Sequence, residues 1–188
     1  MGLLIIPTMT TAEDSEHQVP TAEDEDRFWS LVEQAWSRAD DAVNLARRAL
    51  ATRAADADPS ADLRVVDGAS DGFLKALGGL CEEMSAGELT DLDRVVERKL
   101  YDIDRKEIQA VTDGSDDGFL YARGFIVALG RDYYNAVDAD PGMAILDCDL
   151  EAMCYFFTHL HERKFGSRPE TGSGISRESC ANRVGWGA

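Results

Sequence analysis

Residues 85–103 read SAGELTDLDRVVERKLYDI and carry the clearest helix signal in the chain. The segment opens with a capping box, in which the Ser85 side chain accepts from the amide of Glu88 and the Glu88 side chain reaches back to the amide of Ser85. Apolar side chains then recur with the period of an α-helix, at Leu89, Leu92, Val96, Leu100 and Ile103. We therefore predict an amphipathic helix. We expect its charged positions to face solvent, namely Asp93, Arg94, Glu97 and Arg98.

The same period recurs on both sides of this segment, and no long alternation typical of a β-strand is present. Besides 85–103, helices are predicted from residue 26 to Trp36, over 42–53, in a short segment around 74–80, from Gly118 through Tyr133 with an end at Pro141, and over 149–164. The predicted fold class is all-α, a compact single-domain helical bundle of about five to six helices with disordered termini.

Three regions differ in composition. Residues 1–24 are predicted to be a disordered acidic extension, because they offer few apolar side chains to offset the entropy of ordering. Residues 25–165 form the helical domain. Residues 166–188 are rich in Gly, Ser and Arg without periodicity, so a flexible tail is predicted. Trp186 in this tail either docks on the domain or serves as a partner-binding peptide.

Carboxylates dominate the charge. The 188 residues include 36 Asp and Glu but only 19 Lys and Arg, so the net charge is -17. Nucleic-acid binding needs Lys and Arg to displace counterions, and anionic membranes repel such a chain, so neither is an expected partner. No run approaches the roughly 18 apolar residues of a membrane span. The charge favours a basic protein partner, with association that weakens as salt rises.

The four cysteines form no CxxC pair, so neither a zinc site nor a disulfide framework is indicated. This usage is typical of a reducing compartment, and we expect a cytoplasmic protein without metal or cofactor. Cys154 and His161 are seven residues apart and can share a helix face, but one such pair falls far short of a metal site. No P-loop, GxGxxG, GxSxG or HExxH motif occurs.

One pattern occurs twice: residues 67–74 read DGASDGFL and residues 113–120 read DGSDDGFL. We interpret both as helix entries, in which an Asp caps free amides, Gly permits the turn and the Phe-Leu pair anchors the first helical turn. The second copy also matches the start of an EF-hand loop, at Asp113, Ser115, Asp117 and Gly118. Gly124 stands where that loop requires a bidentate Glu, so capping is favoured over calcium binding.

Several segments are shared with a known family: EDRFWSLVE at 25–33, SAGEL at 85–89, GSDDGF at 114–119 and GRDYY at 130–134. Together they resemble the bacterial domain-of-unknown-function family DUF4240, which typically shows an early Phe-Trp, a Ser-Asp-Asp-Gly-Phe signature and a helix ending in Gly-Arg. The resemblance covers roughly residues 25–165. It implies an all-helical fold and no established activity. Arg123 matches the family helix, whereas Ala122 and Phe125 replace its bulkier aromatic residues.

The remaining candidate site combines two carboxylates and two guanidiniums, those of Asp116, Asp117, Arg123 and Arg131. Such a set can build a polar pocket for acid–base chemistry or for binding. The structural alternative is that Asp117 caps a helix while an Arg holds the loop.

Two functions are compatible with these sequence features. The favoured one is a non-enzymatic protein-interaction or regulatory module with an acidic surface, for example an inhibitor of a basic nuclease or toxin. The alternative is a small hydrolase or ligand-binding enzyme centred on the four residues. A pocket into which they converge would favour the enzyme, and a flat acidic face would favour the binding module.

Overall fold

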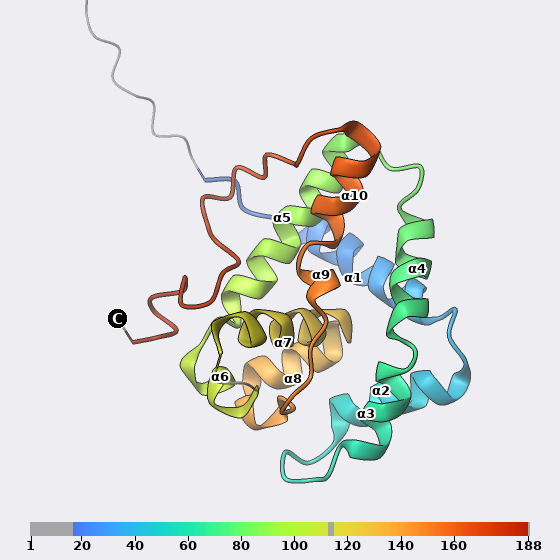
Figure 1. Ribbon diagram of the computed structural model, residues 1–188, viewed down its shortest axis with the longest axis vertical. Coiled ribbons are helices and arrows are strands. Elements are labelled where there is room, and N and C mark those ends of the chain that lie inside the picture. Colours follow the sequence, from blue (N-terminus) through green and yellow to red (C-terminus); the bar gives the residue numbers. More distant parts are fainter. Residues whose placement is uncertain (1–16, 113–114, 188) are drawn as a thin grey trace, which may run out of the picture.

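A computed structural model describes residues 17–112 and 115–187 of the chain (Figure 1). Within these ranges it holds ten α-helices, one 3-10 helix and no β-strand, which confirms the predicted all-α class. The predicted number of about five to six helices is wrong. Two predicted helices are each split in two, and two short helices, α3 (Ser60–Asp67) and α6 (Lys106–Thr112), were not predicted. None of the described helices is both long and apolar enough to cross a bilayer.

The first helix, α1 (Ala22–Trp36), begins inside the extension that was predicted to run to residue 24. Its start is fixed by a capping box, in which Asp24 N donates to the Thr21 side chain and Thr21 N donates to the Asp24 carboxylate at 2.9 Å. The predicted apolar face is buried. The rest of the predicted extension, residues 1–16, lies outside the described residues.

Two further helices, α2 (Asp41–Thr52) and α4 (Ser70–Leu80), complete the N-terminal half. The ring of Trp36 at the end of α1 stacks on Phe73 of α4 with 4.4 Å between ring centroids. Trp36 Nε1 also donates to the carbonyl of Ala128 at 2.7 Å. The buried indole therefore keeps a hydrogen-bond partner while it joins three helices in one core.

The central helix is α5 (Ala86–Asp102). It packs against α1, α7 (Asp116–Ala128) and α10 (Phe156–Phe165). The structure confirms the capping box of Ser85 and Glu88 and the burial of Leu89, Leu92, Val96 and Leu100. The expectation that the charged positions face solvent is wrong for three of them. Asp93 is 2% exposed, Arg94 is 8% exposed and the side chain of Glu97 is 13% exposed, because the C-terminal segment covers this side of the helix.

The helix predicted from Gly118 through Tyr133 is two helices, α7 (Asp116–Ala128) and α8 (Arg131–Ala139). They meet at Gly130, whose φ of 98° interrupts the helical conformation. A 3-10 helix, η1 (Pro141–Met143), follows α8. The helix predicted over 149–164 is likewise split, into α9 (Glu151–Cys154) and α10 (Phe156–Phe165), at the non-helical Tyr155.

The two copies of the repeated pattern differ in structure. In the first, Asp67 is the last residue of α3 and α4 begins without a side-chain cap, so the predicted Asp cap is wrong there. In the second, Ser115 caps α7 by accepting from Gly118 N at 3.0 Å. The Asp113–Gly114 pair lies outside the described residues. The predicted anchoring role is confirmed, since Phe73 and Phe119 are both buried.

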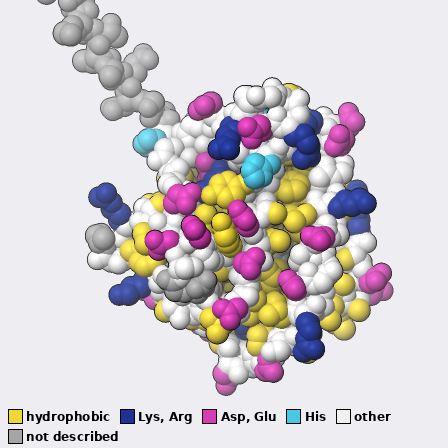
Figure 2. Space-filling model, in the orientation of Figure 1, with side chains coloured by type: hydrophobic (Ala, Val, Ile, Leu, Met, Phe, Trp, Pro, Cys, Tyr) yellow, Lys and Arg dark blue, Asp and Glu magenta, His cyan; other side chains and the backbone are white. Residues whose placement is uncertain are grey.

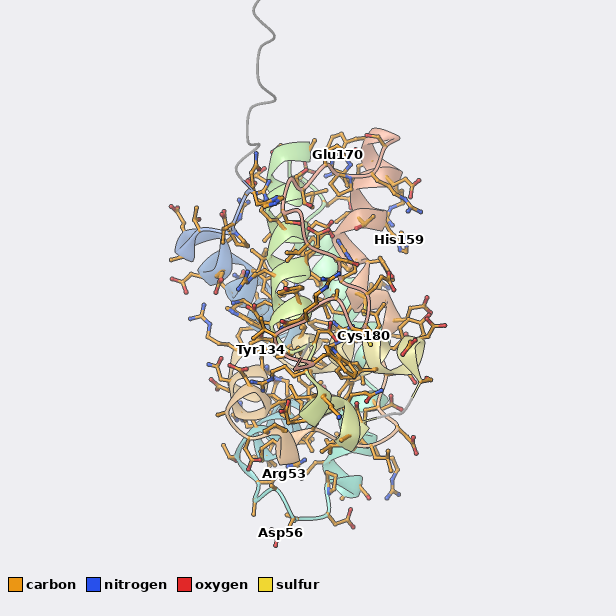
Figure 3. All side chains as sticks on the ribbon, turned by 90° about the vertical axis from the view of Figure 1, so that its left-hand side faces the viewer. Arg53, Asp56, Tyr134, His159, Glu170 and Cys180 are labelled. Carbon is orange, nitrogen blue, oxygen red and sulfur yellow. The ribbon has the colours of Figure 1, made fainter. Side chains whose placement is uncertain are left out.

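The C-terminal segment differs from the flexible tail predicted for 166–188. Residues 167–187, which we call the C-terminal strap, run from the end of α10 along α5 (Figure 1). Figure 3 faces this side and shows the strap passing α5 between Glu170 and Cys180. Trp186 is half-buried and its Nε1 donates to the Asp104 carboxylate at 2.9 Å. The strap is ordered by polar contacts, which an apolar periodicity does not reveal.

Candidate functional site

Asp116 and Asp117 lie exposed in the first turn of α7. Carboxylates are favoured there by the positive end of the helix dipole. The hydrogen-bonding cap is Ser115, so the prediction that Asp117 provides the cap is wrong. The backbone carbonyl of Asp116 accepts from Ser179 Oγ at 2.6 Å, which ties the start of α7 to the C-terminal strap.

Arg123 lies two turns further along α7 and is fully buried. Its guanidinium donates to Leu100 O at 2.7 Å and to Ser179 Oγ at 3.1 Å, and it lies 4.8 Å from the centre of the Phe119 ring. Desolvation lowers the pKa of Arg123. Arg123 is therefore a structural residue between α5, α7 and the strap, and its side chain does not face solvent.

Arg131 begins α8 and donates to Asp26 of α1 at 2.5 Å. It lines an open cleft of about 490 Å³ between α1 and α8, together with Trp29 and Asp132. None of the other three predicted site residues lines this cleft. The structure thus places the four residues at three locations, and the pocket required by the hydrolase alternative is not formed by them.

The exposed carboxylates of α7 instead belong to a larger surface. Glu151 of α9 and Asp117 both act electrostatically on Tyr121, and the backbone amide of Leu150 donates to Tyr121 O at 3.0 Å. We call this surface the acidic face, and its carboxylates are Asp67, Asp116, Asp117, Asp147, Asp149, Glu151 and Glu178. All seven are exposed, and none forms an ion pair within the described residues. Figure 2 shows Asp and Glu side chains distributed among apolar ones on the side that carries α9.

Two tyrosines lie within the acidic face. Tyr155 Oη donates to Glu178 at 3.1 Å, and partial burial together with this carboxylate raises the pKa of Tyr155 to about 12. Desolvation and the charges of Glu151 and Asp117 also raise the pKa of Tyr121. Both phenols are therefore protonated at neutral pH, and each is hydrogen-bonded to a carboxylate of the face, Tyr155 to Glu178 and Tyr121 to Glu151.

A pocket of about 470 Å³ opens at the lower end of the acidic face. Its apolar lining comes from Leu63 and Phe125, and its rim carries three of the seven carboxylates, those of Asp67, Asp147 and Asp149. Arg64 is the one basic residue among its lining residues in the described chain. The lining of the pocket therefore combines the apolar side chains of Leu63 and Phe125 with three carboxylates, an arrangement suited to a cationic side chain with an apolar stem.

Cys154 and His161, the pair considered in the sequence analysis, do not form a reactive or metal-binding site. Burial raises the pKa of Cys154 and of Cys148 to about 12, which keeps both thiols protonated. Cys154 Sγ donates to Leu120 O, whereas His161 Nδ1 lies 2.6 Å from Ser167 O. Over residues 17–112 and 115–187, no three His, Cys, Asp or Glu side chains are grouped to hold a metal ion.

Sequence reasoning missed five of the seven carboxylates of the acidic face. The run LDCDLE at 146–151 does contain three acids at alternating positions in a short interval. No sequence signal links them to Asp67 or Glu178, because these residues come from α3 and from the strap.

Comparisons with protein-family models, with curated proteins and with solved structures found no match to this chain. The resemblance to DUF4240 therefore stays a prediction.

Proposed function

We propose that the protein is an interaction module whose acidic face binds a basic partner protein. The observation that supports this is the concentration of seven exposed carboxylates without ion pairs around two tyrosines and one pocket. In contrast, three acids of α1 are neutralised by ion pairs with a Lys or Arg, namely Glu25, Asp26 and Glu33. Unneutralised charge on one face attracts a cationic partner and orients its approach.

The pocket supports the same partner chemistry. A Lys or Arg side chain can place its methylene stem against Leu63 and Phe125 while its charge meets the carboxylates at the rim. The rings of Tyr121 and Tyr155 add apolar contact area beside these carboxylates. The four cysteines are free, which is compatible with a cytoplasmic location, and we keep that location as part of the proposal.

The test uses a decalysine peptide as the probe and calorimetric titration of the full-length protein. The face variant carries Asp116→Asn, Asp117→Asn, Glu151→Gln and Glu178→Gln. The matched control carries Asp41→Asn, Asp56→Asn, Glu82→Gln and Glu83→Gln, which neutralise four exposed acids on other parts of the surface. Both variants have the same net charge, so they separate the local field of the face from the total charge.

We expect the face variant to bind the peptide about tenfold more weakly than wild type, and the control about twofold more weakly at most. The salt dependence of binding should also decrease in the face variant alone. Equal losses in the two variants would show that only the total charge matters and would refute the acidic face as the site.

A further inference from the structure

The C-terminal strap is held almost entirely by polar contacts. Within residues 167–187 the buried side chains are those of Ser173 and Arg177. Trp186 adds the main apolar contact, with its ring centroid 6.1 Å from that of Phe119. Because little apolar area is buried, the hydrophobic effect contributes little to keeping the strap in place. The strap is therefore among the segments that we expect to detach most readily.

At the centre of the strap, the guanidinium of Arg177 is surrounded by hydrogen-bond acceptors and an aromatic ring. The two carboxylates come from successive turns of α5: Asp93 and Glu97 each accept at 2.9 Å. The backbone carbonyl of Cys154 accepts at 2.5 Å, and the Tyr155 ring centre lies 5.3 Å from the guanidinium carbon. We call Asp93, Glu97, Cys154 O and the Tyr155 ring the arginine cage.

The cage is preorganised by the helices that build it. Asp93 is 2% exposed and accepts a hydrogen bond from Thr158 Oγ1 at 2.9 Å, so its carboxylate is oriented by α10 as well as by α5. Nη1 of Arg177 donates to Asp93 and Cys154 O, while Nη2 donates to Asp93 and Glu97. This planar fork is specific to arginine, because the ammonium of lysine is a single point of donation.

The surface beside the cage contacts mainly main-chain groups of the strap. Glu97 also accepts from Ser173 Oγ at 2.7 Å, and Arg94 Nε donates to Thr171 O at 2.6 Å. Further along, Asp104 is fully buried and accepts from the amides of Cys180 and Asn182. These contacts are made to main-chain groups and one hydroxyl of the strap, whose φ angles are positive at Gly172 and Gly174. A competing segment therefore needs an arginine and a backbone that can adopt the same irregular path.

We propose that the arginine cage and the adjoining side of α5 form a recognition site for an irregular, arginine-bearing segment of a partner protein, which the C-terminal strap occupies in cis. A buried ion pair contributes little net stability compared with apolar packing, so selectivity is the more direct benefit of this cage. A tethered segment competes at an effective concentration in the millimolar range, and its release regulates access to the site. Asp93 and Glu97 do not belong to the acidic face, but Tyr155 and the strap residue Glu178 do, so release of the strap would also remove Glu178 from that face.

The experiment measures binding of a fluorescent peptide with the sequence of residues 170–187 to the full-length protein. The variant Arg177→Ala empties the cage of its own arginine. We expect it to bind the peptide about tenfold or more tightly than wild type, in which the strap competes. A peptide with Arg177→Lys should bind that variant about tenfold more weakly than the unmodified peptide, because it lacks the guanidinium fork. The control peptide carries Arg183→Lys and should bind unchanged, since Arg183 is exposed and forms no ion pair in the described chain.

Arg177→Ala leaves the carboxylates of Asp93 and Glu97 unpaired and can prevent folding. A second variant therefore tests the proposal without breaking these ion pairs. Trp186→Ala keeps the ion pairs but removes the indole that donates to Asp104. It should also bind the peptide more tightly than wild type, and hydrogen exchange should show the strap amides less protected. The proposal is overturned if faster strap exchange brings no gain in peptide affinity, or if the Arg177→Lys and Arg183→Lys peptides bind equally well.

Discussion

Replacement of Gly124 by alanine tests how closely α7 and α9 approach each other. A Cβ atom at Gly124 would lie 2.6 Å from Cys154 Sγ and 2.6 Å from Leu150 O, whereas ordinary contacts begin near 3.4 Å. The backbone carbonyl cannot rotate away, so α9 must move by nearly an ångström (about 0.8 Å). That shift would disturb the hydrogen bonds from Leu150 N to Tyr121 O and from Cys154 Sγ to Leu120 O.

The expected magnitude follows from three contributions. Overpacking costs about 1–3 kcal/mol, and a weakened hydrogen bond adds about 0.5–1.5 kcal/mol. The lower entropy of the unfolded alanine chain offsets about 0.4–1 kcal/mol. The net loss in the free energy of unfolding for Gly124→Ala is therefore about 0.5–4 kcal/mol.

The matched control is Gly72→Ala, a helical glycine in α4 with no atom near the added Cβ. It should stabilise the protein by about 0.4–1 kcal/mol, because only the unfolded-state term remains. Urea unfolding followed by tryptophan fluorescence gives both values on the full-length chain. If Gly124→Ala is as stable as Gly72→Ala, the close contact of α7 with α9 described above is refuted.

Three further predictions concern single side chains. Phe119→Ala should lower the free energy of unfolding by about 3–5 kcal/mol in urea denaturation, because the ring is fully buried, and a loss below about 1 kcal/mol would contradict that burial. Ser115→Ala should lower the free energy of unfolding by about 1 kcal/mol, because the helix cap is lost, and Asp117→Ala should lower it by less. A larger loss for Asp117→Ala would show that Asp117 provides the cap. The amide of Ser85, with the Arg27 guanidinium and the Ser85 hydroxyl, lowers the pKa of Glu88 from 4.5 to about 2. Glu88 therefore stabilises the fold above pH 4.5, and this contribution disappears as the pH falls toward 2, so thermal melts of Glu88→Gln should vary less over that interval than those of wild type.

The helical class followed from the sequence because apolar periodicity and capping are local signals. The capping box at Ser85 and the buried faces of α1 and α5 were predicted in this way. The breaks at Gly130 and Tyr155 were not, because each depends on how the following helix packs against the rest of the core. A local pattern continues through such residues, whereas the tertiary structure bends the chain there.

The candidate site was predicted less well, for a related reason. Asp116 and Asp117 were recognised as exposed carboxylates, but Arg123 was expected beside them and is buried under the strap. Helical periodicity states which residues share a helix face, and it does not state which other segment covers that face. Docking of Trp186 was one of the two alternatives considered from the sequence, and the structure shows it. The strap has no periodicity, so its path along α5 and the burial of Asp93 beneath it were not predicted.

The most direct test of the proposed function is a ¹H–¹⁵N NMR titration of the full-length protein with decalysine at moderate ionic strength. We expect the largest amide shift changes at the start of α7, at residues 147–151 and at Glu178. Changes centred instead on Asp41, Asp56 or Glu82, or changes spread evenly over all exposed acids, would contradict a binding site at the acidic face.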